Sequence, residues 1–299
     1  MRYLIDVVFV IFMPNYETLI EALNSIESQV RTVYVIDNSD CIKADNELMY
    51  ILNTMQNVVL VRLFVNVGIG KAQNIGMKKC IEKRSDFILL SDQDTIYPPN
   101  YIEQMFAKFD SIYDNQKIAA IAPNFTDSNK CGDSEGFFYL NGLNSIKIKS
   151  ILMYEDVSQV IASGMIINTS YISDIGMMDE DLFIDWVDFE WCWRAKSKGY
   201  RIIGFSDIHI NHTLGDSSAK IANKTYSIHL PERNYYIVRN GISISLTKRY
   251  LSLQTRWNIF LKSLRYMIGF SLLCRQHFKN IKFCLQGFYH GLIGRLGPY

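Results

Sequence analysis

Apolar runs of strand length alternate with amphipathic segments of helix length through the first half of the sequence. Runs rich in Val, Ile and Phe cover residues 7–12, 33–36, 58–63 and 87–90. The segments between them begin near residues 16, 43 and 70 and carry apolar residues at three- and four-residue spacing. This alternation is typical of βα units, in which helices pack on a parallel sheet. We therefore expect an α/β fold with a mostly parallel sheet flanked by helices.

Polar residues directly follow three of these runs. The three clusters are Asp37-Asn38-Ser39 after the second run, Asn66-Val67-Gly68 after the third and Asp92-Gln93-Asp94 after the fourth. Right-handed βα connections gather the carboxyl ends of the strands along one edge, and ligands of open α/β sheets bind outside that edge. The three clusters therefore predict a single binding crevice.

The paired carboxylates at the end of the fourth run suggest a cation site. In an extended backbone, residues i and i+2 project to the same side, so Asp92 and Asp94 can converge on one ion. Hard cations prefer oxygen ligands of this kind. The alternative is that both are turn or N-cap aspartates ahead of Pro98 and Pro99.

An acidic segment marks the second half of the sequence. Residues 179–190 include six Asp and Glu residues and no basic residue. A helical pattern follows at 191–198, and a strand-like stretch runs from Arg201 to near His212. Earlier, residues 131–149 are rich in Gly, Asn and Ser, which predicts an irregular excursion or an edge hairpin.

Composition limits the class of protein. The 299 residues are 48% hydrophobic, which excludes a disordered chain and predicts a substantial core. The six cysteines show no Cys-x-x-Cys spacing, so we expect free thiols in a reducing compartment. The apolar N-terminal stretch lacks a small-residue cleavage site and is interpreted as a buried strand, not a signal peptide. No transmembrane helix is expected, because uncharged runs after Arg233, such as the nine residues between Arg265 and Arg275, are much shorter than the about 20 residues of a span.

The C-terminal part is strongly basic, since residues 233–299 contain eleven Lys and Arg and no Asp or Glu. Thr255, Asn258, Lys262 and Arg265 recur there at helical spacing, which predicts a basic amphipathic helix. Such helices lie at the interface of anionic membranes. The alternative is packing on the α/β part or on a second subunit, as in a homo-oligomer. No nucleic-acid-binding motif accompanies the charge, so nucleic acid is not an expected partner.

Four motifs in a fixed order carry a resemblance to a known family. They are YVIDNS at residues 34–39, NVGIGKAQN at 66–74, SDQDT at 91–95 and DWVDFEWCWR at 185–194. With these motifs, the sequence resembles family 2 glycosyltransferases of the GT-A fold, and most of all their bacterial rhamnosyltransferase branch. The resemblance implies a Rossmann-like GT-A domain, which we place at residues 1–225, followed by a basic helical extension at 226–299.

The resemblance implies a site for a nucleotide. Asp37 would accept a hydrogen bond from the imide N–H of a uracil or thymine base, and Asp92 would lie near the ribose. The other nucleotide-binding candidates are Asn66 and Gly68 in the loop after the third strand and Lys71 and Asn74 in the helix that follows. The alternatives are an Asx-turn for Asp37, a turn for the loop residues and a solvent-facing helix position for the last two.

The resemblance also implies a divalent metal, magnesium or manganese, held by Asp94 and Asp92. Such a cation offsets the charge that develops on a nucleoside diphosphate leaving group. His212 matches a position where a histidine supplies a further metal ligand; the alternative is a structural histidine at a strand end.

In the fourth motif, Asp188 holds the position of the base that takes the proton from the acceptor hydroxyl. Its alternative role is ordinary surface acidity, against which its aromatic neighbours argue, because a carboxylate among aromatics tends to have a raised pKa. Glu190 is placed to pair with Arg194 at i,i+4. One departure from the family is Phe12-Met13 before Pro14, where many relatives have Tyr-Asn.

The expected function is that of a cytoplasmic, membrane-surface glycosyltransferase. It would move rhamnose from dTDP-rhamnose, with inversion, onto a polyprenyl-linked oligosaccharide for an O-antigen or capsule type of polysaccharide. The alternatives are a transferase of the same fold that uses a UDP-hexose and a non-catalytic carbohydrate-binding or scaffold protein. A nucleotidyltransferase is disfavoured, because no Gly-rich phosphate loop follows the first strand.

Overall fold

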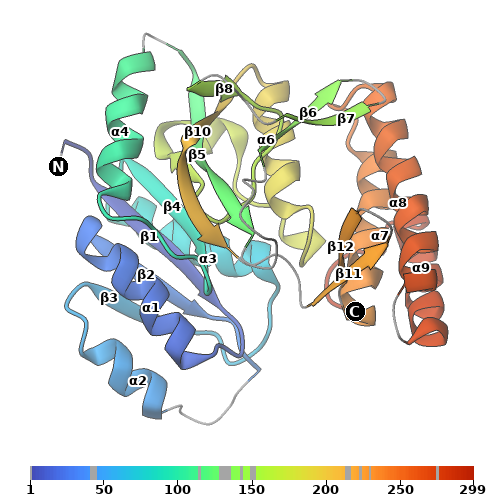
Figure 1. Cartoon of the computed structure of the whole chain (residues 1–299), viewed down its shortest axis with the longest axis horizontal. Helices are drawn as coiled ribbons and strands as arrows, with labels where there is room; N and C mark the ends of the chain where they lie inside the picture. The colour runs from blue at the N-terminus through green and yellow to red at the C-terminus, as the bar shows by residue number, and fades with distance from the viewer. Residues whose placement is uncertain are drawn as a thin grey trace.

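A central eight-stranded sheet organises the molecule (Figure 1). The computed structural model describes residues 2–40, 46–113, 116–127, 136–141, 144–148, 153–212, 217–221, 224–228, 230–273 and 276–299. The strand order is β3-β2-β1-β4-β9-β5-β10-β8. These strands are Ile5–Ile11 (β1), Thr32–Asp37 (β2), Val58–Arg62 (β3), Phe87–Asp92 (β4), Ile118–Asp127 (β5), Tyr154–Asp156 (β8), Ile166–Asn168 (β9) and Arg201–His212 (β10).

The sheet is mostly parallel, which confirms the predicted fold class. Strands β1 to β4 pair in parallel with one another, as do β5 and β10. The short strand β9 runs antiparallel between β4 and β5, and β8 runs antiparallel along β10. The four apolar runs at the start of the chain form β1 to β4, as the sequence predicted, so β2, β3 and β4 end at one edge of the sheet.

Helices cover both faces of the sheet and enclose two cores. The helices of the first part are Tyr16–Ile26 (α1), Asn46–Asn53 (α2), Ile69–Glu82 (α3), Tyr101–Ile112 (α4), Ile172–Ile175 (α5) and Val187–Ser197 (α6). Val8 and Val10 of β1 pack with α3, α5 and α6, whereas Val7 and Phe9 pack with α1, α2 and α4. A strand that is buried on both faces needs this continuous run of apolar residues.

Two hairpins lie outside the main sheet. Strands Phe137–Asn141 (β6) and Asn144–Ile148 (β7) form one, and strands Ser217–Ile221 (β11) and Lys224–Ile228 (β12) form the other. The first confirms the predicted hairpin within residues 131–149, but as a separate two-stranded sheet. The parts of that segment at 131–135, 142–143 and 149 lie outside the described residues.

Three helices follow the sheet and pack side by side at one end of the molecule (Figure 1). They are Pro231–Thr247 (α7), Leu253–Leu273 (α8) and His277–Leu292 (α9). Helix α7 is almost entirely buried, and α9 approaches it closely because a Cβ at Gly287 would lie 2.5 Å from the Tyr235 carbonyl oxygen. The chain then folds back, and the Gly297 N–H donates to the Asp181 carbonyl oxygen at 2.8 Å.

The orientation of α8 differs from the predicted polar stripe. Asn258 is buried with Ser263 against α7, whereas Trp257 and Ile268 are 56% and 58% exposed. Ile259 is buried on the same helix, and the Ser263 side chain packs closely on α7, because Gly241 has no side chain to block it. Among the described residues, no helix has the length and apolar character needed to cross a membrane.

Candidate active site

The loops after β1 and β2 form a pocket around Asp37, the last residue of β2. Its side chain is nearly buried; one carboxylate oxygen accepts from the Ser39 N–H at 3.1 Å, and the other accepts from Arg62 Nε at 3.3 Å. The pocket has a volume of about 240 Å³. It is lined by Met13, Pro14, Tyr16, Asp37, Ser39, Leu48 and Arg62. The structure thus places Asp37 in a concave site at the carboxyl edge, where the sequence predicted a base-binding residue.

Asn66 joins the loops after β2 and β3. Its Oδ1 accepts from Asn38 Nδ2 at 3.0 Å and from the Gly68 N–H at 3.0 Å. In the opposite direction, Asn38 Oδ1 accepts from the Val67 N–H at 2.8 Å. These hydrogen bonds fix the two loops together, and the role of Asn66 in nucleotide binding stays a prediction.

Gly68 and Asn74 hold helix α3 against the acidic segment. Gly68 has φ 85°, and a Cβ there would lie 2.6 Å from Phe183 Cδ2, so only glycine fits. The Asn74 amide donates to Met178 O at 3.0 Å and accepts from the Met178 N–H at 2.9 Å. Lys71 is exposed in the first turn of α3. Of these three residues, Gly68 and Asn74 connect the nucleotide side of the site to the segment that carries Asp188.

Asp92 and Asp94 lie at the end of β4. Asp92 Oδ2 accepts a hydrogen bond from Ser163 Oγ at 2.5 Å. Just after Asp94, the backbone of Ile96 pairs antiparallel with that of Asn211. The nitrogen-to-oxygen distances of the two hydrogen bonds are 3.0 and 3.2 Å. This pairing brings the end of β10 beside the Asp92–Asp94 turn, and the backbone of its last residue, His212, lies there. The His212 side chain is outside the described part of the structure.

The end of β4 supplies oxygen ligands for a cation. The described residues include no group of three or more His, Cys, Asp or Glu side chains arranged to hold a metal ion. The two carboxylates at the end of β4 offer the oxygen ligands that hard cations prefer, and the 96–211 bridge brings the backbone of the third predicted ligand alongside. The residues present therefore fit a divalent cation in donor chemistry.

Asp188 lies in the first turn of α6. Its carboxylate accepts from the Ala162 N–H at 3.1 Å and from the Phe189 N–H at 2.9 Å. Burial raises its pKa to about 7, and the negative charges of Asp92 and Asp185 act in the same direction, while the two N–H donors oppose them. A carboxyl group with this pKa is suited to accept a proton near neutral pH.

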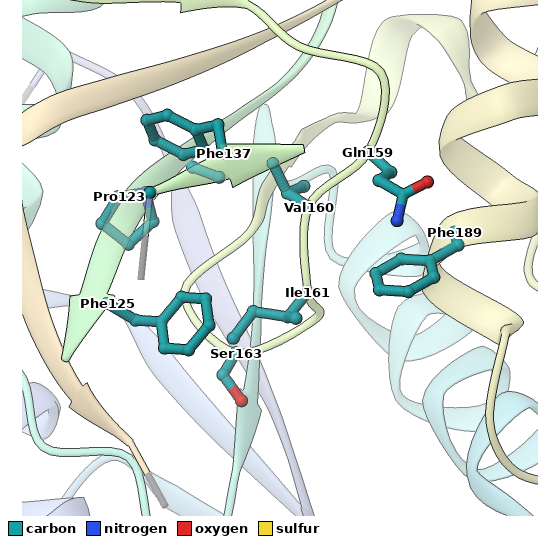
Figure 2. A pocket seen from close by; sticks show the side chains of 10 residues that line it. Pro123, Phe125, Phe137, Gln159, Val160, Ile161, Ser163 and Phe189 are labelled. Carbon is teal, nitrogen blue, oxygen red and sulfur yellow. The ribbon is translucent and has the colours of Figure 1, made fainter. Parts of the chain in front are cut away.

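The segment between β8 and β9 connects the two halves of the site. Ala162 contacts Asp188, and the next residue, Ser163, contacts Asp92. Figure 2 shows Ser163 and Phe189 at a small, mostly apolar hollow beside this segment. The sequence did not point to Ser163, because no local motif signals a contact between residues 71 positions apart.

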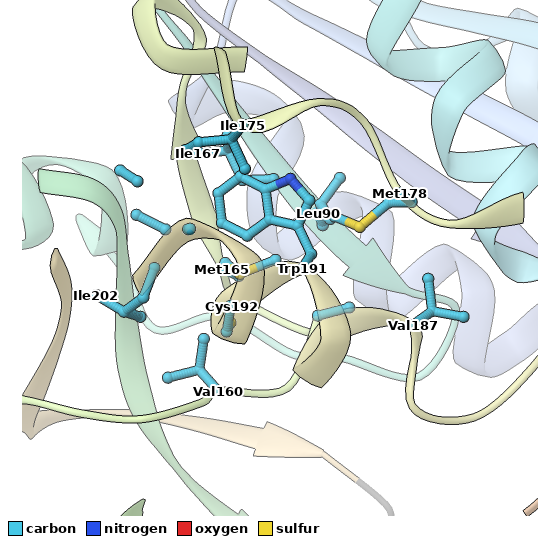
Figure 3. Packing of buried hydrophobic residues seen from close by; sticks show 14 of the residues in the cluster. Leu90, Val160, Met165, Ile167, Ile175, Met178, Val187, Trp191, Cys192 and Ile202 are labelled. Carbon is cyan, nitrogen blue, oxygen red and sulfur yellow. The ribbon is translucent and has the colours of Figure 1, made fainter. Parts of the chain in front are cut away.

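The rest of α6 anchors Asp188 to the core. Trp191 is fully buried among residues from the sheet and α5 (Figure 3), and its Nε1 donates to Gly176 O at 2.9 Å. The predicted Glu190–Arg194 pair is confirmed, with N–O distances of 2.9 and 2.8 Å. The Tyr250 hydroxyl, between α7 and α8, also donates to Glu190 at 2.5 Å. Helix α6 is thus tied both to the sheet and to the C-terminal helices.

The backbone just before Asp188 is strained. Phe183, Asp185 and Trp186 all have positive φ, at 66°, 63° and 67°. Phe183 also has ψ −65°, and the N–H of Ile184 donates to Leu182 O at 2.8 Å, which is the rare form of γ-turn. Each such residue costs about 1–3 kcal/mol, and such strain persists only where the surroundings enforce it.

Solved structures define the fold. The structure matches Staphylococcus aureus TarS 1–349 in complex with UDP-GlcNAc with a TM-score of 0.59 at 18% identity, covering 96% of this chain and 81% of TarS 1–349. It matches GalNAc-T7 with UDP, GalNAc and Mn²⁺ with a TM-score of 0.57 at 14% identity, covering 89% and 57% of the two chains. The fold is therefore that of GT-A glycosyltransferases.

Sequence comparison identifies the family. The model described as Glycosyl transferase family 2 matches residues 7–176, and the chain belongs to this family. It is also 33% identical over 253 residues to the dTDP-rhamnosyl transferase RfbF of Shigella flexneri, which covers 82% of this chain and 81% of RfbF. The protein is thus a glycosyltransferase similar to rhamnosyltransferases, as the four motifs predicted.

Proposed function

We propose that the chain is an inverting rhamnosyltransferase that uses dTDP-rhamnose. The similarity to RfbF over most of both chains is the observation that carries this proposal. The site supports it, because a pocket around Asp37 and a carboxylate at Asp188 with a pKa near neutrality lie along one edge of one sheet. The competing donor is a UDP-hexose, since uracil and thymine present the same imide N–H to Asp37.

The chain's own residues divide the work of the reaction. Asp37 accepts a hydrogen bond from the nucleobase of the donor. Asp188 takes the proton from the acceptor hydroxyl, on the face of the sugar opposite the departing diphosphate. Ala162 and Ser163 keep the Asp188 and Asp92 carboxylates in fixed positions relative to each other. Asp94 and Asp92, with His212, would hold magnesium or manganese, which when bound supplies positive charge to the leaving diphosphate.

A panel of donors tests this function. We expect dTDP and dTDP-rhamnose to raise the melting temperature of the protein more than UDP, UDP-glucose, UDP-galactose or UDP-GlcNAc, each measured with Mg²⁺, Mn²⁺ or EDTA. The Asp37→Asn variant should lose this shift, and Asp110→Asn, a surface carboxylate on α4, is the matched control. A larger shift with a UDP-sugar would replace the donor, and no shift with any nucleotide would favour a non-catalytic protein.

We further propose that the acceptor is a polyprenyl-linked saccharide, as in O-antigen or capsule synthesis, reached from the inner face of the cell membrane. The outer side of α9 supports contact with an anionic membrane, because Phe278, Leu285 and Tyr289 are 91%, 55% and 58% exposed there. These positions recur at helical spacing with the exposed Lys282 between them. These exposed residues lie on α9, whereas the sequence predicted the membrane-binding helix one helix earlier, around residues 255–265.

Vesicle binding checks the membrane contact. The protein should sediment with phosphatidylglycerol vesicles and much less with phosphatidylcholine vesicles, since cationic side chains are attracted only to the anionic surface. Changing Phe278, Leu285 and Tyr289 together to serine should weaken binding about tenfold or more, because the apolar face drives insertion. Changing the exposed Met49 and Tyr50 of α2 to serine is the control. Equal binding by all three proteins, or a dimer that dissociates in the triple variant, would refute the membrane contact.

A further inference from the structure

Helix α7 directs side-chain donors at the backbone that precedes Asp188. Asn240 is fully buried, and its Nδ2 lies 2.8 Å from Leu182 O, 2.8 Å from Ile184 O and 3.2 Å from Asp185 O. Its Oδ1 accepts from Nε of the neighbouring Arg239 at 2.9 Å, which fixes the orientation of the amide. The two N–H groups of one side chain therefore reach three carbonyl oxygens of a short irregular segment.

Two arginines of α7 reinforce this contact. Arg239 is also fully buried, and its Nη2 donates to Leu182 O at 2.9 Å and to Asp181 O at 3.3 Å. Arg233, which is more exposed, pairs with the Asp185 carboxylate at 3.0 Å. All these groups act on residues 181–185, so the donors of α7 converge on one stretch of backbone.

The bound segment is the strained one. Three positive-φ residues lie between 183 and 186, and Asp188 follows two residues later. A strained segment relaxes when the groups that enforce it are removed. Asp188 is fixed on its other side by the Ala162 N–H, so relaxation of 181–186 would move the carboxylate relative to Ala162 and Asp92.

We propose that Asn240 is a positioning residue for the base: it holds the strained 182–185 backbone so that Asp188 stays buried beside Ala162 and faces the acceptor. The proposal rests on the proposed role of Asp188. It assigns a catalytic purpose to a helix that lies in the basic C-terminal part, outside residues 7–176 to which the family model extends.

The test compares two asparagines of the same helix. Asn240→Leu removes the donors at similar volume, and Asn234→Leu is the matched control, because Asn234 is equally buried on α7 and donates to Asn280 of α9 at 2.7 Å. The rate is measured as dTDP release from dTDP-rhamnose with a membrane extract of lipid-linked saccharides, per mole of folded protein. In Asn240→Leu we expect kcat to fall about tenfold to a hundredfold, as small misplacements of reacting groups do, with the KM for the donor within about twofold.

A pH profile separates positioning from general loss of structure. Because burial raises the pKa of Asp188, a loosened segment admits water and lowers it, so the acid limb of kcat/KM should move to lower pH in Asn240→Leu and stay in place in Asn234→Leu. Unchanged kcat and an unchanged acid limb in Asn240→Leu would overturn the proposal, as would equal losses in the two variants.

Two further variants, Arg233→Gln and Asp188→Asn, make the result of this test unambiguous. If Asn240→Leu does not fold, the Arg233→Gln variant tests the proposal instead, because it removes the more exposed contact to Asp185. A lower kcat with a shifted acid limb in this variant supports the proposal. Wild-type values of both quantities overturn it. Asp188→Asn is measured in parallel. A full rate of sugar transfer in Asp188→Asn would refute the assignment of Asp188 as the base. A low transfer rate in Asp188→Asn together with a wild-type rate in Asn240→Leu would refute only the positioning role of Asn240.

Discussion

Replacing Asp188 with asparagine should lower the rate of sugar transfer by about 10²–10⁴-fold, the usual contribution of a general base. Asparagine has the same shape and keeps an oxygen for the Ala162 N–H, so the change removes proton acceptance and the hydrogen bond from the Phe189 N–H. Donor binding should persist, because the pocket around Asp37 lies on β2. The measurements are single-turnover transfer rates and the affinity for dTDP.

The pH dependence of kcat/KM of the wild-type enzyme is an independent test of Asp188 as the general base. Asp188 acts as a base only when it is deprotonated, and burial raises its pKa to about 7. The value of kcat/KM should therefore be constant above pH 7 and fall about tenfold per unit below it. A carboxylate with an ordinary pKa near 4 would give a flat profile from pH 5.5 to 8.

The control for this experiment is Asp174→Asn, an exposed carboxylate of α5 that pairs with Lys198 and Tyr200. It should retain the wild-type rate and acid limb. The acid limb should disappear from whatever rate remains in Asp188→Asn. Retention of full transfer by that variant, at any pH, would remove Asp188 from the mechanism.

Replacing Asp94 with alanine should lower kcat by about 10²–10³-fold, in the range seen when one group that stabilises developing charge is lost. The effect on donor affinity should be smaller, because the charge on the diphosphate grows as the glycosidic bond breaks. Activity of the wild type should fall with EDTA and return with Mg²⁺ or Mn²⁺. In the variant, half-maximal activation should need a higher metal concentration.

The matched control is Asp110→Ala, which removes a surface carboxylate that accepts hydrogen bonds from Tyr3 and Arg2. It should show the wild-type metal response. If Asp94→Ala kept both the rate and the metal response of the wild type, the cation would have to be held elsewhere. If EDTA had no effect on the wild type, a metal-independent reaction would replace the proposed one.

The parts of the fold that follow from local patterns could be predicted from the sequence. Strands β1, β2 and β4 are buried on both faces, so their apolar runs are unambiguous, and the Glu190–Arg194 pair follows from helical spacing alone. The strand ends also placed Asp37 and Asp92 at one edge. Arg62 could have been recognised with them, because it ends β3 directly opposite Asp37 in the register of the sheet.

The features that depend on distant contacts could not be predicted in this way. Ser163 reaches Asp92 only because β9 inserts antiparallel between β4 and β5. The predicted stripe on α8 misjudged Asn258, since helical spacing shows that a face is polar but not which neighbour covers it. Asn240 lies in a helix buried on nearly all sides, where amphipathic periodicity disappears and a buried polar residue carries no local signature.

The contact of Gly297 with the acidic segment has a consequence for the timing of synthesis. Gly297 bonds to Asp181, and Arg239 donates to the Gly297 carbonyl oxygen. Ribosomes make chains from the N-terminus at about 5–20 residues per second, so the sheet and Asp188 emerge several seconds before Gly297, which contacts the segment ahead of Asp188. A nascent chain should therefore carry the donor pocket before it can transfer sugar, and catalytic competence should arrive only once Gly297 has been made and has docked.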